Sequence, residues 1–200
     1  MAGLRELKKE RTRALLVEVS QRLFAEQGYD ATTLEQIAAE AELSVPTVLT
    51  YFPSKEKLAL APEYLVVEQF RAEVEDPQRA EATRDIWRRT VAEGARALTK
   101  GVRRAPDRAA ALASVQRSVD AGRLQVMTEY ERVLRSGLAV DDGVDDGADG
   151  LATSVLATAL AFSTLSVLRD WLAADGRFDL ETRAVAAADL AIERLAFRPR

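Results

Sequence analysis

The sequence contains no cysteine and no histidine. Without cysteine there can be no disulfides, thiolate metal sites or cysteine nucleophiles, and without histidine the commonest general base and a common zinc ligand are missing. Only six prolines and ten glycines interrupt the 200 residues. Alanine, leucine, glutamate and arginine, which favour helices, dominate the remainder, so the composition predicts an all-α protein.

The chain also lacks a strong excess of one charge. Its formal net charge is −4, with 30% charged and 48% hydrophobic residues, proportions that are ordinary for a soluble globular protein. Any affinity for nucleic acid must therefore come from a local basic patch. The first thirty residues are charged and helical in pattern, unlike a signal peptide, so we expect a cytoplasmic protein.

No catalytic constellation is visible, because neither an ordered carboxylate pair nor a phosphate-binding loop is present. Acidic residues gather in residues 139–150, AVDDGVDDGADG, but they do not alternate and no glutamate closes the segment as an EF-hand requires. We expect a disordered acidic loop there. The sequence predicts no enzyme, no catalytic residue, no cofactor and no metal ligand.

The N-terminal region begins with one long predicted helix, residues 4–27. Its apolar residues recur at helical spacing, and Gly28 provides a left-handed stop. The residues expected to share the inward face are Leu15, Leu16, Val19, Leu23 and Phe24.

Two short helices joined by a tight turn follow, which is the pattern of a helix-turn-helix. Thr32 and Glu35 have the spacing of a capping box at the start of the first helix. Ser44 is expected to cap the second, where Pro46 is tolerated because it falls in the first turn.

Longer helices occupy the rest of the chain. Ser54 is expected to cap a helix that runs to about Val74, with a kink or a break at Pro62. Further helices are predicted near residues 80–103, 107–119, 150–174 and 180–197, with one more that begins after Gly122. The helix after Gly122 carries a continuous apolar stripe made of Val126, Met127, Tyr130, Val133, Leu134 and Leu138.

An ordered set of residues in the first third of the chain forms a specific pattern: Leu23-Phe24, Gly28-Tyr29, Thr32-Thr33, Ile37-Ala38, Ala41, Leu43-Ser44, Thr47, Tyr51-Phe52, Ser54-Lys55-Glu56 and Leu58. In these positions the chain resembles the TetR family of bacterial transcriptional regulators. The resemblance implies an N-terminal three-helix, helix-turn-helix DNA-binding domain (residues 1–55). It also implies a C-terminal helical ligand-binding and dimerisation domain (residues 56–200).

The helix beginning at Ser44 is the one expected to enter the major groove of DNA. The residues that it would present are Val45, Pro46, Thr47 and Thr50, and Ser44 at its start is also predicted to contact DNA. Small and apolar groups can meet thymine methyls, but none of these residues can make a bidentate contact to a base. We therefore expect modest direct readout of the bases and a larger contribution from DNA shape.

Phosphates are the second expected target. Thr33 and Lys55 lie at predicted helix starts, where backbone amides favour an anion. Thr47 and Tyr51 offer hydroxyls to the DNA backbone. The resemblance implies that these four residues contact phosphates. Residues 1–13 hold five basic and two acidic residues, and this N-terminal arm is either a further DNA contact or a solvated charge run.

Three residues depart from the family pattern. Glu42 stands where glycine is usual at the turn, and a left-handed backbone there would cost on the order of 1 kcal/mol. Pro46 replaces a commoner glycine or alanine, and Leu49 replaces a frequent tyrosine, which removes one phosphate-binding hydroxyl. The operator sequence cannot be predicted from these residues.

The last two predicted helices are apolar enough to form an interface. Residues 151–168 contain no charge and are borderline in length for a membrane span, but their many small residues favour a buried packing helix. The last helix offers a second stripe, which comprises Val185, Ala188, Ile192 and Leu195. Pairing of both helices with a second copy would make a homodimer through a four-helix interface; the alternative is that both stripes serve the monomer core.

Residues 80–174 would enclose any ligand. Candidates for lining an apolar pocket are Trp87, Met127, Tyr130 and Phe162, and the alternative for each is ordinary core packing. Such a pocket would suit a hydrophobic or aromatic small molecule. The helix that begins at Ser54 links both domains, so its tilt could transmit ligand binding, with Pro62 as the hinge.

These features predict a dimeric regulator that binds a double-stranded DNA operator, most simply a repressor released from a palindromic operator by a small-molecule effector. The alternative is a helical small-molecule carrier or adaptor with a vestigial DNA-binding head. Whether the regulator represses or activates depends on where the operator lies relative to a promoter.

Overall fold

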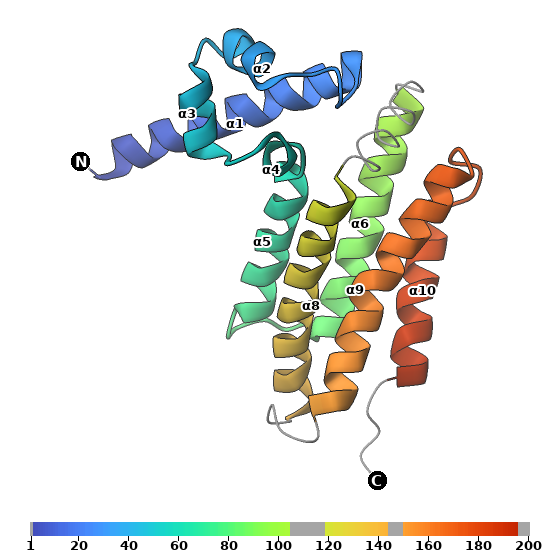
Figure 1. Ribbon diagram of the computed structural model, residues 1–200. Helices are drawn as coiled ribbons and strands as arrows, with labels where there is room; N and C mark the ends of the chain where they lie inside the picture. The colour runs from blue at the N-terminus through green and yellow to red at the C-terminus, as the bar shows by residue number, and fades with distance from the viewer. Residues whose placement is uncertain (1, 105–118, 144–149, 196–200) are drawn as a thin grey trace. The chain divides into compact units, whose positions relative to one another are not determined.

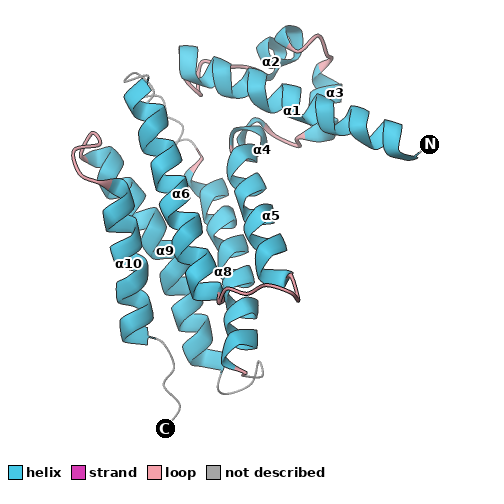
Figure 2. Ribbon diagram, turned by 180° about the vertical axis from the view of Figure 1, so that it is seen from behind, coloured by secondary structure: helices cyan, strands magenta, loops and turns pink. Residues whose placement is uncertain are grey.

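The computed structural model describes residues 2–104, 119–143 and 150–195, and over these residues the chain forms helices and no strand (Figures 1 and 2). The all-α class predicted from the composition is confirmed. The helices are α1 (Ala2–Gln27), α2 (Leu34–Glu40), α3 (Val45–Tyr51), α4 (Lys55–Ala59), α5 (Ala61–Glu75), α6 (Thr83–Arg104), α8 (Asp120–Asp142), α9 (Gly150–Ala173) and α10 (Leu180–Leu195). The helix predicted near residues 107–119 falls almost wholly outside the described residues.

The described chain divides into two compact units. The first holds α1 to α4, the start of α5 as far as Tyr64, and the start of α8 as far as Arg123. The second holds the remainder of α5 and α8 together with α6, α9 and α10. The division into domains at residue 55 stays a prediction; within the first compact unit α4 packs against α1.

In the first unit, α2 and α4 pack against α1, and α3 packs against α2. Each of the four helices contributes a side chain with no exposed surface, namely Leu16, Ile37, Val48 and Leu58. Leu15, expected on the inward face, is instead 41% exposed, because the buried arc of α1 passes through its neighbour Leu16 and through Val19 and Phe24. Gly28 has φ 87°, which confirms the left-handed stop after α1.

The helix starts in this unit follow the predicted caps with one correction. Ser44 and Ser54 are the N-caps of α3 and α4. The capping box, however, joins Thr33 and Gln36, one residue later than predicted. Thr32 cannot cap α2 because its side chain is fully buried and its hydroxyl donates to the Gly28 carbonyl at 2.7 Å.

The predicted interruption near Pro62 is present and lies two residues earlier. α4 ends at Ala59, its C-cap is Leu60, and α5 begins at Ala61. Pro62 then falls in the first turn of α5, where a missing backbone N–H removes no helical hydrogen bond. The chain therefore breaks before Pro62 rather than bending at it.

The second unit is built from long helices. α10 packs against α9 and α6. All six residues of the apolar stripe predicted on α8 are buried, and Leu134 and Leu138 have no exposed surface. α9 contributes Leu156, Ala157, Leu160 and Ala161, each at most 1% exposed. Both closing helices begin where predicted, at residues 150 and 180, and α9 ends one residue earlier than predicted.

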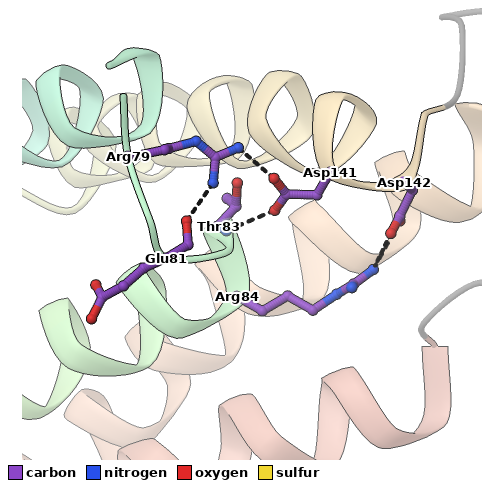
Figure 3. Close-up of polar contacts among 6 residues, drawn as sticks. All are labelled: Arg79, Glu81, Thr83, Arg84, Asp141 and Asp142. Carbon is purple, nitrogen blue, oxygen red and sulfur yellow. Dashed lines mark hydrogen bonds and ion pairs between the residues drawn. The ribbon is translucent and has the colours of Figure 1, made fainter. Parts of the chain in front are cut away.

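α8 extends into the predicted acidic loop, which corrects that prediction for residues 139–142. Asp141 accepts the backbone N–H of Thr83 at 2.7 Å and pairs with Arg79 (Figure 3). Asp142 accepts two hydrogen bonds from Arg84, at 2.7 and 2.8 Å (Figure 3). These partners hold the end of α8 against the start of α6, so the two carboxylates are structural. Residues 144–149 of the predicted loop lie outside the described residues.

Among the described helices, α9 alone is long and apolar enough to cross a membrane by length and composition. One of its faces is buried against the rest of the second unit, and α10 packs on it. A core helix of this kind meets the same two criteria as a membrane helix, so they do not decide between them.

Glu42, in the turn between α2 and α3, has φ 54°. The turn is closed by backbone hydrogen bonds from Glu42 to Ala39 at 3.1 Å and from Leu43 to Ala38 at 2.8 Å. A left-handed conformation is strained for any residue with a Cβ atom. The left-handed backbone anticipated for glutamate at this position is therefore present.

Replacing Glu42 by glycine should raise the free energy of unfolding by about 1 kcal/mol, because glycine adopts the left-handed backbone without strain. Urea denaturation followed by circular dichroism measures this. Glu35→Gly, in the first turn of α2, is the matched control and should lower stability by about 0.5–1 kcal/mol. A loss of stability in Glu42→Gly would show that the turn does not strain glutamate.

Candidate nucleic-acid interface

α3 presents one face to solvent and the opposite face to the core of the first unit. On the core side, Val48 is fully buried, and Phe52, the C-cap residue of α3, is 2% exposed. On the other face Pro46, Leu49 and Thr50 are exposed. Val45 and Thr47 of the predicted set are half-buried, while Ser44, just before the helix, is exposed. The predicted reading helix therefore has an accessible surface, and none of its seven residues is charged.

The hydroxyl groups on and before α3 already have partners within the chain. Ser44 Oγ and Thr47 Oγ1 share a hydrogen bond of 2.8 Å, and Ser44 Oγ also accepts the Thr47 N–H at 3.3 Å. Thr50 Oγ1 donates to the Pro46 carbonyl at 2.9 Å. Thr50 therefore has no hydroxyl hydrogen left for a base, whereas one hydrogen of the Ser44–Thr47 pair stays available.

Thr33 lies at the start of α2 with its side chain exposed. Its hydroxyl oxygen accepts the Gln36 N–H at 3.2 Å, and the Gln36 amide oxygen accepts the Thr33 N–H at 2.8 Å. The hydroxyl hydrogen of Thr33 is not used by this capping box, so it can be donated outward. Tyr51, the last residue of α3, is half-buried.

Lys55 has a structural role that its sequence position did not indicate. Its ammonium group donates to the carbonyl oxygens of Tyr29 and Thr32, both at 2.9 Å, and lies 4.2 Å from the centroid of the Tyr29 ring. Burial raises the pKa of the Tyr29 phenol, and the carboxylates of Glu56 and Asp30 add to that rise, so the ring stays neutral. Two of the three ammonium N–H groups are thereby occupied within the first unit.

The N-terminal arm is the first part of α1. Its basic residues Arg5, Lys8, Lys9, Arg11 and Arg13 are all exposed. The guanidinium group of Arg13 lies 4.7 Å from the centroid of the Phe52 ring, directly after α3. A cation–π contact of this kind orients the guanidinium. It places one positive charge beside the end of the reading helix, a proximity that the sequence pattern did not reveal.

Residues 16–61 match the model of a family described as bacterial regulatory proteins, tetR family. Over 73 residues the chain is 44% identical to the HTH-type transcriptional regulator TcmR of Streptomyces glaucescens; the match covers 36% of this chain and 32% of TcmR. The segment that includes α2, α3 and α4 is therefore similar to the N-terminal domain of the TetR family. A second relative, the HTH-type transcriptional regulator YuxN of Bacillus subtilis, is 43% identical over 24% of this chain and 16% of its own length. The chain therefore aligns with less than a third of either relative.

Solved structures extend the likeness in fold to more of the chain. A TetR-family transcriptional repressor, FadR of Thermus thermophilus in complex with lauroyl-CoA, has a TM-score of 0.59 at 18% identity, covering 94% of this chain and 97% of that one. SmeT in complex with triclosan has a TM-score of 0.58 at 23% identity, covering 94% and 95%. At these identities the likeness concerns the fold alone.

The ligand candidates lie in the second unit, and the structure brings two of them together. Trp87 and Tyr130 meet edge to face with ring centroids 5.2 Å apart, and Phe70, which the sequence did not single out, lies 5.4 and 5.7 Å from them. Met127 is 8% exposed and Phe162 is half-buried. The indole N–H of Trp87 is buried and has no hydrogen-bond acceptor among the described residues.

Replacing Lys55 by methionine should lower the free energy of unfolding by about 2 kcal/mol, because two carbonyl oxygens lose their donor. Urea denaturation measures this loss. Lys9→Met, an exposed cation in the arm of α1, should change stability by less than about 0.5 kcal/mol. Equal stabilities for both variants would show that the contacts of Lys55 do not support the fold, and that any loss of DNA binding in Lys55 variants is direct.

Proposed function

We propose that this chain is a dimeric, ligand-responsive transcriptional regulator, and specifically a repressor that leaves a palindromic operator when a small hydrophobic or aromatic molecule binds. The observation that carries the proposal is the TetR-family domain in which α3 exposes Pro46, Leu49 and Thr50 while Val48 fixes its opposite face in the core. A short helix held in this way can enter a major groove.

Phosphate contacts supply most of the affinity in this proposal. Thr33 and the Ser44–Thr47 pair retain hydroxyl hydrogens, and Tyr51 and the third N–H of Lys55 add donors. The exposed cations of the N-terminal arm extend this set. Because the whole chain is negative, binding depends on these local groups and weakens steeply as salt rises.

Dimerisation through α9 and α10 would join two reading heads, the helix-turn-helix regions that contain α2 and α3 of each copy. Leu151 and Val155 on α9 are 72% and 45% exposed, and Leu190 on α10 is 56% exposed. Ala188, which was predicted in the interface stripe, is fully buried within the unit and serves its core instead. Exposed leucines on two adjacent apolar helices favour burial against a second copy, and two heads would then read half-sites about one helical turn apart.

The effector site is proposed in the second unit around Trp87, Met127, Tyr130 and Phe162. The aromatic contacts of Trp87 and Tyr130 favour a flat or apolar ligand, and the unpaired indole N–H favours a ligand with a hydrogen-bond acceptor. The FadR neighbour was solved with lauroyl-CoA, which carries an apolar acyl chain, and the SmeT neighbour with triclosan.

Transmission to the reading head is proposed to pass through the first turn of α8. Glu56 of α4 accepts the N–H of Gly122 at 2.8 Å, and Glu63 of α5 pairs with Arg123 at 2.5 Å. A Cβ atom at Gly122 would lie 2.7 Å from a terminal methyl carbon of Leu60, so a larger residue there would require the side chains of Leu60 and Glu56 to move. Met127 follows Arg123 by about one turn of the same helix. A ligand that moves α8 would therefore also move α4 through the Glu56–Gly122 hydrogen bond, and α4 would rotate about the break before Pro62.

Replacing Tyr51 by phenylalanine should weaken binding to a duplex enriched from random DNA by about 1 kcal/mol per head, or roughly thirtyfold for the dimer. The slope of log K against log salt should stay the same, because the hydroxyl is uncharged. Fluorescence anisotropy at several salt concentrations measures both. Tyr64→Phe, a tyrosine that accepts from Lys57 away from α3, is the control and should bind normally. Equal affinities in both variants would count against the phosphate role of Tyr51.

Replacing Leu190 by arginine should convert the dimer to monomers, because a charge cannot be buried at the proposed interface without a partner. Sedimentation velocity measures the oligomeric state. Val140→Arg introduces the same charge at an exposed position of α8, where the side chain is 73% exposed, and should leave the dimer intact. A Leu190→Arg dimer as stable as the unsubstituted one would place the interface elsewhere.

A further inference from the structure

The exposed face of α3 is almost entirely hydrocarbon. Pro46, Leu49 and Thr50 are related by three and four positions, so they lie next to one another on one side of the helix. Leu49 is 40% exposed, although Val48 and Phe52 already fill the inward side. Its side chain is therefore not needed for the core of the first unit.

The polar atoms on this face are restricted to the Thr50 hydroxyl. Its hydrogen is donated to the Pro46 carbonyl at 2.9 Å, so the group keeps only acceptor capacity. The arginine, lysine, asparagine and glutamine side chains that read purines by paired hydrogen bonds are absent from α3. The face cannot distinguish bases by donating hydrogen bonds from its side chains.

The major groove offers one apolar feature, the C5 methyl group of thymine. We propose that Leu49, flanked by the Pro46 ring and the Thr50 methyl, recognises thymine methyl groups and sets the sequence preference of the reading head. This inference rests on the proposed function, since it requires α3 to enter a major groove. It assigns to Leu49 a specificity-determining role and predicts adjacent thymines in each half-site.

The test uses the full chain and a duplex that it enriches from random DNA. Each thymine of the half-site is replaced in turn by deoxyuridine, which removes only the methyl group and keeps base pairing. At one or two adjacent positions the affinity should fall about fourfold per half-site, or roughly fifteenfold with both half-sites changed, the effect of one buried methyl group. Replacing the same thymines by 5-methylcytosine should preserve more affinity than replacing them by cytosine.

A variant of Leu49 tests whether this side chain makes the contact with the thymine methyl group. Leu49→Ala should bind the thymine and deoxyuridine duplexes with affinities within twofold of each other, because the shorter alanine side chain no longer reaches the methyl group. Leu65→Ala removes another exposed leucine, from α5, where the side chain is 60% exposed, and should retain the full difference.

The outcomes separate this inference from the proposed function. An enriched duplex that tolerates deoxyuridine at every position would overturn the role of Leu49 and leave DNA binding standing. A difference that survives in Leu49→Ala would also overturn it, by assigning the methyl contact to another residue. If no duplex is enriched at all, both proposals fail.

Discussion

The arrangement of the reading head depends on one ammonium group. Lys55, at the start of α4, donates to two carbonyl oxygens of the segment that joins α1 to α2 and lies against the ring of Tyr29. α3 is the only helix between α2 and α4, so fixing the start of α4 to the approach to α2 limits the directions in which α3 can point. Because Val48 is fully buried, α3 takes the orientation in which its opposite, uncharged face is exposed. A residue that a sequence pattern marks for DNA is thus also a structural residue.

In the proposed function, affinity and specificity depend on different groups of the DNA-binding head. Hydroxyls at the helix starts and exposed cations of α1 accompany α3, a helix that carries no charge of its own. These hydroxyls and cations would bind the phosphate backbone of any sequence, whereas the hydrocarbon face of Leu49 and its neighbours could respond only to the shape and methyl groups of the bases. The negative charge of the whole chain makes the local cations of the arm more important, since no general attraction assists them.

The sequence predicted features that depend on local chemistry. The caps Ser44 and Ser54 and the inward stripe of α8 were all found where expected, because capping and helical periodicity involve residues a few positions apart. The capping box was placed one residue early, since Thr32 and Thr33 are chemically alike and only burial separates them. The roles of Asp141 and Lys55 could not be read from the sequence, because their partners lie 58 and 26 positions away. Which positions of α10 face outward was likewise decided by packing.

The most direct test of the exposed α3 face exploits the absence of cysteine, because a single introduced thiol is then the only one in the chain. Leu49→Cys and Leu65→Cys are alkylated with and without a saturating amount of the enriched duplex, and the two rates are compared. If α3 enters the groove, the duplex slows alkylation of the thiol at position 49 at least tenfold and leaves the thiol at position 65 unaffected. A thiol at position 49 that reacts equally fast in the bound complex would contradict this orientation of the reading head.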